Sequence, residues 1–473
     1  MKLVVWKRAC ATIFLFLAAA SVSSAQTFNT LLLFGGADGA QPYAGLVQGT
    51  DGNLYGTTTA GGTHGHGTVF RITTSGTLST IYNFCAMPNC EDGEYPSTLL
   101  LAGDGNFYGA ASGGGLYGAG LIFKMPAGGK PTPIYNFCSE TNCPDGYAPQ
   151  GPLIQGTDGN FWGTTHEGGS DNSGTVFELS PGGKLTTIHS FQYTDGYMPN
   201  ALIQATDGNF YGTTYSGGMT DCYYWSDCGT VFKITPGGTL TTLYSFDFTH
   251  GATPYAPLIE ANNGKFYGTT YYGGYESIYG CVYGCGTVFR ITAEGVLTTV
   301  TTFRSAEAQN PTAPLIQATD GNLYGTALLS EDCTGEIFEI TLSGTFNNLY
   351  CFGQLGQFLY PEAGLFQSTN GVLYGTTVGD GGWEGSVYSE SVGLGPFAIS
   401  VPSAGKAGQG VILLGTNLTG TTSVTFNGKG ARFKVVSATE ITATVPAGAT
   451  TGTIQVVTPG GTLSSNIPFR VIQ

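Results

Sequence analysis

The chain has 473 residues, of which 76 are glycine; 10% of its residues are charged, 41% are hydrophobic and 12% are aromatic. At roughly 100–200 residues per domain, this length allows two to four domains, and the apolar content excludes a disordered glycine-rich chain. The formal net charge of −15 argues against nucleic acid as a partner, because an acidic surface repels phosphate backbones.

Residues 1–25 have the pattern of a cleaved secretory signal peptide. Lys2, Lys7 and Arg8 precede an apolar stretch, and Ser23–Ala25 supplies small residues for cleavage. The apolar stretch is shorter than the ~20 residues that a membrane helix needs, although an uncleaved anchor is the alternative. No later segment is long and apolar enough to cross a membrane. Removing residues 1–25 takes away three basic residues and leaves 13 Lys and Arg against 31 Asp and Glu, a net charge of −18.

An internal repeat dominates the chain from residue 26 to residue 392. The string Asp-Gly-Asn-(Leu/Phe)-(Tyr/Trp)-Gly recurs at steps of 49–57 residues, and a fixed period of this kind indicates a repeat architecture. The copies begin at Asp51, Asp104, Asp158, Asp207, Asn263, Asp320 and Asn370.

Each copy contains four short runs rich in Val, Ile, Thr, Tyr and Phe, which predict four antiparallel strands. Asp-Gly between the first two runs favours a tight hairpin. Four antiparallel strands repeated in this way predict the blade of a β-propeller. Thr27–Phe34 matches a fourth strand, and the last copy lacks one. We therefore predict an all-β fold in which residues 26–392 form a seven-bladed β-propeller closed by the N-terminal strand.

The repeat stops after residue 392. Residues 393–395 are expected to be a linker, and residues 396–473 alternate apolar and polar residues in short runs separated by glycine-rich turns. This pattern predicts a small immunoglobulin-like β-sandwich.

Two families resemble parts of the chain. The pattern P-x-x-x-L-I-Q-x-T-D-G-N-x-Y-G-T-T-x-x-G-G…G-T-V-F over about 28–392 resembles the GloVer tandem repeat of bacterial exported proteins, although copy six lacks the Gly-Gly and copy seven has Ser-Val-Tyr for Thr-Val-Phe. The tail, with VILLGTNL, VTFNG, TVP and PFRV, resembles an IPT/TIG domain. The first resemblance implies export but assigns no activity and no catalytic residue. The second implies a spacer or interaction module.

Ten cysteines remain after the signal peptide, and they fall into pairs that are close in sequence. No pair has the CxxC spacing of zinc sites and no histidine accompanies one, so disulfides in an oxidising compartment are the preferred interpretation over metal binding. The pairs are Cys85 with Cys90, Cys138 with Cys143, Cys222 with Cys228, Cys281 with Cys285, and Cys333 with Cys351.

The candidate ligand site is a cluster of aromatic residues in two long loops of the fourth and fifth copies. In a propeller these loops share a face with the connections between blades, and variable loops on a rigid scaffold are where binding resides. Tyrosine and tryptophan offer flat apolar faces with a polar edge, which suits sugars and protein surfaces; the alternative is that the rings pack on each other. The candidates are Tyr223, Tyr224, Trp225, Tyr271, Tyr272, Tyr275, Tyr279 and Tyr283.

The sequence singles out no catalytic residue, no metal site and no cofactor. Five histidines are present without a GxSxG elbow, and the repeated Asp of Asp-Gly-Asn is assigned to turn chemistry rather than calcium binding. A glutamine that recurs in the first strand is expected to be hydrogen-bonded packing, with ligand binding as the alternative. Carboxylates on the variable face that could support glycan cleavage are Glu167, Asp171, Asp221, Asp227, Glu331, Asp332 and Glu362.

Three functions remain open at this point. The first hypothesis is a secreted or cell-surface bacterial protein that binds an extracellular glycan or protein without catalysis. The alternatives are an exported polysaccharide hydrolase or lyase that uses carboxylates on the same face, and a structural protein of the envelope or matrix.

Overall fold

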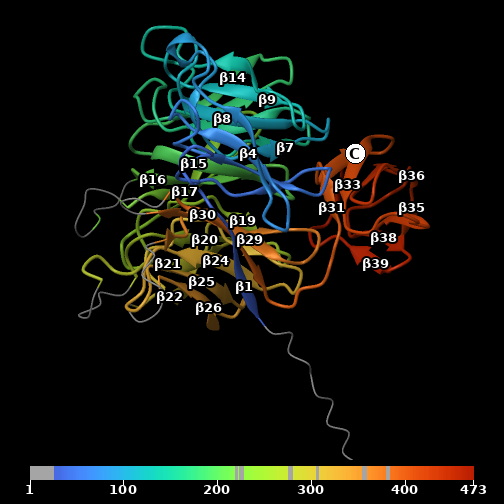
Figure 1. The fold of residues 1–473 in the computed structure, drawn as a ribbon. Coiled ribbons are helices and arrows are strands. Elements are labelled where there is room, and N and C mark those ends of the chain that lie inside the picture. The colour runs from blue at the N-terminus through green and yellow to red at the C-terminus, as the bar shows by residue number, and fades with distance from the viewer. Residues whose placement is uncertain are drawn as a thin grey trace, which may run out of the picture.

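The computed structural model describes residues 26–218, 222, 228–274, 281–304, 308–353, 359–379 and 384–472 (Figure 1). In these residues the regular structure is β-strand apart from one short 3-10 helix, η1 (Pro88–Cys90), which confirms the predicted all-β class. No helix among them is long and apolar enough to cross a membrane. The predicted signal peptide lies outside the described residues.

Each repeat forms an antiparallel sheet, and the described residues contain seven such sheets. The first strands are β2 (Val47–Gln48), β7 (Leu100–Leu101), β11 (Ile154–Gln155), β15 (Tyr197–Gln204), β19 (Ile259–Glu260), β23 (Ile316–Gln317) and β28 (Phe366–Gln367). The second are β3 (Leu54–Thr58), β8 (Phe107–Gly113), β12 (Phe161–Thr165), β16 (Phe210–Ser216), β20 (Phe266–Thr270), β24 (Leu323–Ala327) and β29 (Leu373–Gly379). The third are β4 (Thr68–Ile72), β9 (Leu121–Met125), β13 (Thr175–Leu179), β17 (Thr230–Ile234), β21 (Thr287–Ile291), β25 (Gly335–Ile340) and β30 (Ser386–Ser391). The fourth are β5 (Leu78–Asn83), β10 (Thr132–Asn136), β14 (Leu185–Ser190), β18 (Leu240–Ser245), β22 (Leu297–Thr302), β26 (Phe346–Phe352) and, in the last sheet, β1 (Thr27–Leu33). Two short strands, β6 (Glu94–Pro96) and β27 (Leu359–Tyr360), add to the second and seventh sheets.

The repeated motif explains the local structure of each sheet. In the first repeat the Asp51 carboxylate accepts hydrogen bonds from the Asn53 backbone N–H at 3.1 Å and from the Tyr55 hydroxyl at 3.1 Å, while Gly52 takes a φ of 78°. A glycine suits this turn because positive φ strains other residues. Gly56 is required for a different reason: a Cβ there would lie 2.5 Å from the Phe70 ring on β4. The tyrosine of Tyr-Gly thus closes the turn of Asp-Gly-Asn, and the glycine of Tyr-Gly leaves room for the phenylalanine of Thr-Val-Phe.

The N-terminal strand β1 completes the last sheet, as predicted. It pairs antiparallel with β30, with Thr27 opposite Ser391 and Leu33 opposite Ser386. Phe28 on β1 stacks on Tyr350 of the preceding sheet, with ring centroids 3.5 Å apart, and also contacts Tyr388 at 5.5 Å. The strand thus joins residues more than 300 positions away into one sheet.

The recurring glutamines link successive sheets, in agreement with the packing interpretation. Each side-chain oxygen accepts a hydrogen bond from the backbone of the sheet before it, as when Gln204 accepts from the Thr157 N–H at 2.9 Å. Gln48 of the first sheet accepts from the Thr369 N–H of the last sheet at 3.0 Å. Equivalent bonds involve Gln155 with Gly103, Glu260 with Thr206, Gln317 with Asn262, and Gln367 with Thr319.

The tail forms a two-sheet sandwich beyond the repeats, seen on the right of Figure 1. Its buried core includes Leu413, Phe426, Ile441 and Ile454. One sheet contains β31 (Ile399–Val401), β33 (Gly410–Leu414), β37 (Glu440–Thr444) and β36 (Arg432–Val435); the other contains β35 (Lys429–Gly430), β34 (Ser423–Phe426), β38 (Ile454–Thr458) and β39 (Gly461–Ser464), while β32 (Ala404–Lys406) pairs with β40 (Arg470–Ile472).

The tail packs on the first hairpin turns of the repeats. The second repeat carries Leu101 where the others have Gln or Glu, and Leu101 shares an apolar cluster with Ile412 and Leu414 of the tail. The Thr439 hydroxyl donates to the Thr50 carbonyl at 2.7 Å. Replacing the linking glutamine by leucine in one repeat therefore creates an apolar docking point for the tail.

Candidate functional site

A cavity of 340 Å³ receives residues from all seven repeats. The segment that enters it follows a proline that recurs in every repeat; it leads into the first strand in six repeats and lies within that strand, β15, in the fourth. The residue after that proline lines the cavity in six repeats, and Thr98, one residue further along, does so in the second. The six residues are Tyr43, Gln150, Asn200, Tyr255, Thr312 and Glu362.

Threonine hydroxyls of the Gly-Thr-Thr motif fix the backbone of these segments. The Thr164 hydroxyl of the third repeat donates to the Asn200 carbonyl of the fourth at 2.7 Å, and that of Thr376 in the last repeat donates to the Pro42 carbonyl of the first at 2.7 Å. Thr57 and Thr213 make the equivalent bonds to Ser97 and Ala256, each at 2.9 Å. The framework of the cavity is thus repeated while the side chains that face it differ.

The cavity has polar side chains in a largely apolar lining and carries little charge. Burial raises the pKa of the Glu362 carboxyl above its ordinary value, and burial lowers the pKa of His166 to about 4. The His166 imidazole is therefore neutral at pH 7. Burial and the neighbouring Glu362 charge also raise the pKa of Tyr43. Among the described residues that line the cavity, Glu362 is the sole Asp or Glu, and no Lys or Arg accompanies it.

A second hollow of 310 Å³ adjoins the cavity between the first and second repeats. The two share Tyr43, Thr98 and Gln150, and Tyr95 lines the second one. The exposed fractions of Tyr43, Tyr95 and Tyr255 are 44%, 44% and 42%, so their ring faces are accessible to a ligand. Together the hollows make an elongated depression with aromatic edges, which we call the ring cavity.

Three of the eight predicted aromatic residues belong to the described structure. Tyr271 contacts Tyr272 with ring centroids 4.4 Å apart, and Tyr272 contacts Tyr283 at 5.9 Å, so these rings pack on each other. Tyr255 joins this cluster through Tyr271 at 5.2 Å and also lines the ring cavity. The other five predicted residues, Tyr223, Tyr224, Trp225, Tyr275 and Tyr279, lie outside the described residues.

Sequence reasoning missed most of the ring cavity, although a signal was present. The residue after the repeat proline is Tyr, Ser, Gln, Asn, Tyr, Thr and Glu in the seven copies, within a segment that is otherwise closely repeated. A single variable position in a repeated framework is the pattern expected of a site assembled from every copy. His166 follows the Gly-Thr-Thr motif, where neighbouring repeats have Tyr215 and Tyr271.

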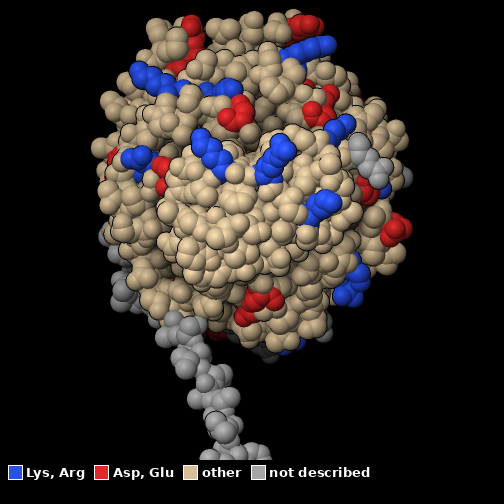
Figure 2. Space-filling view, turned by 90° about the vertical axis from the view of Figure 1, so that its right-hand side faces the viewer, with Lys and Arg blue, Asp and Glu red and all other residues tan. Residues whose placement is uncertain are grey.

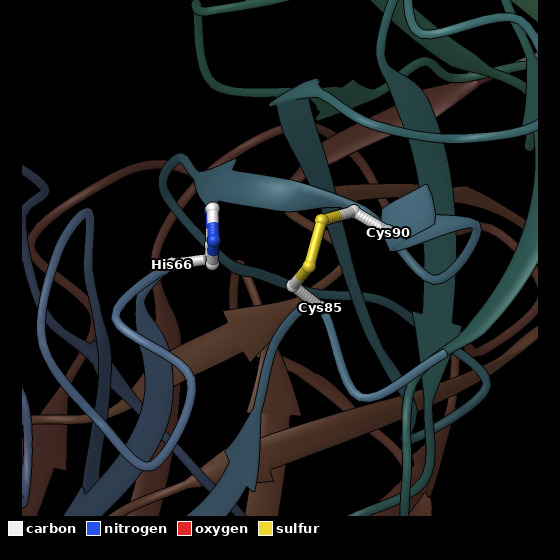
Figure 3. Close-up of side chains that lie close together, drawn as sticks. All are labelled: His66, Cys85 and Cys90. Atoms are coloured by element: carbon white, nitrogen blue, oxygen red, sulfur yellow. A yellow bond between two sulfur atoms is a disulfide. The ribbon is translucent and has the colours of Figure 1, made fainter. Parts of the chain in front are cut away.

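The ten cysteines form five disulfides, in the pairs that their spacing predicts. His66 lies beside the disulfide between Cys85 and Cys90 (Figure 3). In the described part of the chain, this is the one group of three side chains of metal-binding types whose ligand atoms lie close together. A sulfur in a disulfide is not the thiolate that binds metals. The His66 Nδ1 lies 2.7 Å from the Glu94 carboxylate. The group therefore does not form a metal site.

One predicted carboxylate, Glu362, faces the ring cavity, whereas Glu167, Asp171, Glu331 and Asp332 are not among its lining residues. Asp221 and Asp227 lie outside the described residues. Glycoside hydrolysis ordinarily uses two carboxyl groups about 5–10 Å apart. The described ring cavity thus lacks the second carboxylate of such a pair.

Comparisons with known proteins agree with the repeat and tail assignments. The family model described as the Gloeobacter/Verrucomicrobia repeat matches residues 18–225, 104–285 and 203–388, and that of the IPT/TIG domain matches residues 398–471. No curated protein is similar enough in sequence to count as a relative.

Among solved structures, the chain resembles the extracellular domain of BT4673 from B. thetaiotaomicron, described in one structure as a one-component and in another as a hybrid two-component system. The identities are 13% and 12% and the TM-scores 0.51 and 0.52; 94% and 95% of this chain are covered, but only 59% of either BT4673 chain. The periplasmic gluconolactonase PpgL of Pseudomonas aeruginosa is 15% identical over 73% of this chain and 96% of its own, with a TM-score of 0.44. At these identities the BT4673 likeness concerns the fold alone.

Proposed function

The chain belongs to the Gloeobacter/Verrucomicrobia repeat family and carries a C-terminal IPT/TIG domain, and we propose that it is a secreted or cell-surface protein that binds a glycan in the ring cavity without cleaving it. Five disulfides support a location in an oxidising compartment outside the cytoplasm.

The chemistry of the ring cavity is the observation that carries this proposal. Exposed faces of Tyr43, Tyr95 and Tyr255 suit the apolar faces of pyranose rings, as aromatic side chains do when one edge stays polar. Gln150 offers both donors and an acceptor to hydroxyl groups, whereas Asn200 offers only its side-chain oxygen, because its amide group donates to the Thr213 hydroxyl at 3.0 Å and to the Pro254 carbonyl at 2.7 Å. A lining with tyrosine and amide side chains and a single carboxyl group fits an uncharged saccharide better than a phosphate.

We also propose that the seven sheets are the blades of one closed β-propeller, which would place the ring cavity at the mouth of its central channel. Hydrogen bonds between successive sheets support this arrangement, because those of Gln48 with Thr369 and of Thr376 with Pro42 join the last repeat to the first. The predicted boundaries, with blades over 26–392, a linker at 393–395 and the tail at 396–473, are part of this proposal.

The test of the binding proposal removes the two tyrosines that flank the ring cavity. We expect the mature protein to bind one or more oligosaccharides on a glycan array, and Tyr43→Ala with Tyr255→Ala to weaken that binding about 100-fold, since each lost stacking contact is worth about 1–1.5 kcal/mol. Isothermal titration calorimetry with the strongest hit measures the effect.

The matched control replaces two exposed tyrosines outside the cavity lining, Tyr117→Ala with Tyr193→Ala, whose exposed fractions are 54% and 46%. Equal losses in the two double variants would contradict the site assignment. An array without any hit would instead favour a protein ligand or the structural role.

Catalysis by β-elimination is the second candidate, because the ring cavity brings a neutral imidazole close to tyrosine and amide groups. A lyase abstracts the proton beside a carboxylate of its substrate and breaks the bond between the β-carbon and the glycosidic oxygen; the His166 imidazole would accept that proton and return it to the departing oxygen. Glu362→Gln is the control, in which binding should persist, since an amide replaces a carboxyl, and so should elimination by His166. His166→Gln should abolish the ultraviolet absorbance of an unsaturated product if the protein is a lyase. If no unsaturated product forms from acidic polysaccharides, the lyase function is contradicted and only the binding function remains.

A further inference from the structure

The two parts of the chain carry opposite charges. Residues 396–473 contain five basic residues and one acidic residue, Glu440, a net charge of +4, whereas residues 26–395 contain 8 basic and 30 acidic residues, a net charge of −22. Opposite signs within one chain produce potentials that attract different ligands to different surfaces. The tail is therefore the place where an anion would be attracted to this acidic protein.

Three of the basic residues lie close together on one edge of the tail. Lys429 is on β35, and Arg432 and Lys434 are on β36, all three exposed. Arg432 and Lys434 point to the same side of β36 and are about 7 Å apart along the strand, because alternate residues of a strand share a face. Phe433 and Val435, between and after them, pack against the core of the tail.

A shallow groove of 490 Å³ runs beside Arg432, with Gly408, Gly430 and Pro446 in its lining. The exposed Lys406 lies two residues from Gly408, whose backbone N–H donates to the Val445 carbonyl at 2.9 Å. Among the described residues, none of the four basic side chains at 406, 429, 432 and 434 forms an ion pair. Figure 2 shows basic side chains spaced over the tail, with mostly uncharged surface between them.

The fifth basic residue, Arg470, has a different role. Its guanidinium group donates to the Gln204 side-chain oxygen at 3.0 Å and to the Ala205 carbonyl, so it holds the tail on the fourth repeat. Docking on the fourth repeat therefore accounts for Arg470, whereas the four basic side chains at 406, 429, 432 and 434 stay available to a partner.

We propose that the basic edge formed by Lys406, Lys429, Arg432 and Lys434 is a docking surface for an anionic polysaccharide, such as a carboxylated or sulfated glycan of a cell envelope or matrix. A flexible polymer can follow the groove while staying away from the acidic repeats, whose repulsion falls off over about 10 Å at ordinary ionic strength. This second site is separate from the ring cavity and does not depend on it.

A glycan polymer fits this surface better than a membrane does. The tail contains no Trp or Tyr, the residues that anchor proteins at membrane interfaces, and its exposed large apolar side chains are the isolated Val436, Val457 and Ile467. A flat anionic bilayer would also come close to the repeats, which carry a charge of −22. Without aromatic rings at the groove, recognition would rest on charge rather than on stacking with neutral sugars.

The experiment measures binding of the mature full-length protein to immobilised polygalacturonate and dextran sulfate, with neutral dextran and phosphatidylglycerol vesicles as further surfaces. We expect binding to at least one anionic polymer, and the triple variant Lys429→Gln, Arg432→Gln, Lys434→Gln should bind it at least tenfold more weakly. Each basic side chain that binds an anionic group releases about one counterion. In a plot of log affinity against log salt concentration, the slope for the triple variant should therefore be smaller in magnitude than that for the native protein by about two to three.

The matched control, Lys130→Gln with Lys184→Gln and Lys265→Gln, removes the same charge from the repeats and should change the affinity less than twofold. Equal losses in both triple variants would overturn the proposal, as would binding that is insensitive to salt, binding to vesicles but to neither polymer, or no binding to any anionic surface. The melting temperature should be unchanged in both variants, which excludes misfolding as the cause. Binding of a neutral glycan in the ring cavity should also be unchanged, so the two proposals can fail separately.

Discussion

Deleting residues 26–33 from the mature protein should lower its melting temperature by at least about 5 °C. The deletion removes β1 and exposes the hydrogen-bonding edge of β30 along its whole length. It also removes the Phe28 ring from its contacts with Tyr350 and Tyr388. Losing one such aromatic side chain costs about 3–5 kcal/mol, and each kcal/mol corresponds to about 1–2 °C for a repeat region of this length, because the entropy of unfolding grows with chain length.

Differential scanning calorimetry of the two proteins measures this effect, and a synthetic peptide tests its cause. A peptide of residues 26–34 added to the shortened protein should restore part of the lost stability, whereas the same peptide with Phe28→Ala should restore much less. An unchanged melting temperature after deletion would contradict the proposal that β1 closes the ring. Deleting residues 396–473 is the comparison, because all seven sheets of the repeats keep their strands.

The sequence predicted those features that each repeat determines by itself. Asp-Gly-Asn, Tyr-Gly-Thr-Thr and Thr-Val-Phe recur at a fixed spacing, and each motif satisfies its own turn or packs against the next strand, as Gly56 does against Phe70. The assignment of β1 to the last sheet followed from counting strands. Disulfide pairing could also be predicted, because four of the five pairs are only 4–6 residues apart.

The ring cavity could not be predicted in the same way, because it is assembled from one residue of each repeat. No window of the sequence places Tyr43 beside Glu362, which is more than 300 residues away. Long aromatic loops drew attention to the fourth and fifth repeats, where the described tyrosines largely pack on each other. The basic character of the tail could not be seen from the net charge of the whole chain, because that number adds the −22 of residues 26–395 to the +4 of residues 396–473.

The last sheet also contains an exception to the core pattern. Glu390 on β30 lies opposite Leu373, at the position that holds a buried aliphatic residue in the other six sheets, and its own exposed fraction is 0%. Neither carboxylate oxygen has a well-formed hydrogen bond among the described residues. The equivalent residues are Ile72, Met125, Leu179, Ile234, Ile291 and Ile340.

Burial raises the pKa of Glu390 to about 7 from its ordinary value of 4.5, and the Gln26 side chain opposes this shift only in part. Between pH 4.5 and 7 the folded protein therefore keeps a proton that the unfolded chain has lost. Stability falls as the pH rises through this window, and above pH 7 the loss is complete. From the size of the shift, the loss is about 3 kcal/mol.

Glu390→Gln and Glu390→Leu should therefore stabilise the protein at pH 8, raising the melting temperature by about 3–5 °C. At pH 4 Glu390→Gln should have little effect, because the native carboxyl is then already neutral. The exposed Glu140→Gln is the matched control and should leave the whole profile unchanged. A constant difference between Glu390→Gln and the native protein from pH 4 to pH 8 would show that this carboxyl does not titrate in the window.

His166 makes the comparison of variants necessary, because its effect has the opposite sign. Its folded pKa of about 4 lies below the ordinary 6.5, so the unfolded chain binds a proton that the folded protein does not, and stability is lost as the pH falls from 6.5 towards 4. In the native protein, the loss of stability from Glu390 as the pH rises and the loss from His166 as the pH falls nearly cancel. The free energy of unfolding therefore changes little between pH 4.5 and 6.5. In a variant without Glu390, only the loss from His166 at low pH remains, so the free energy of unfolding should rise with pH where it is nearly constant in the native protein.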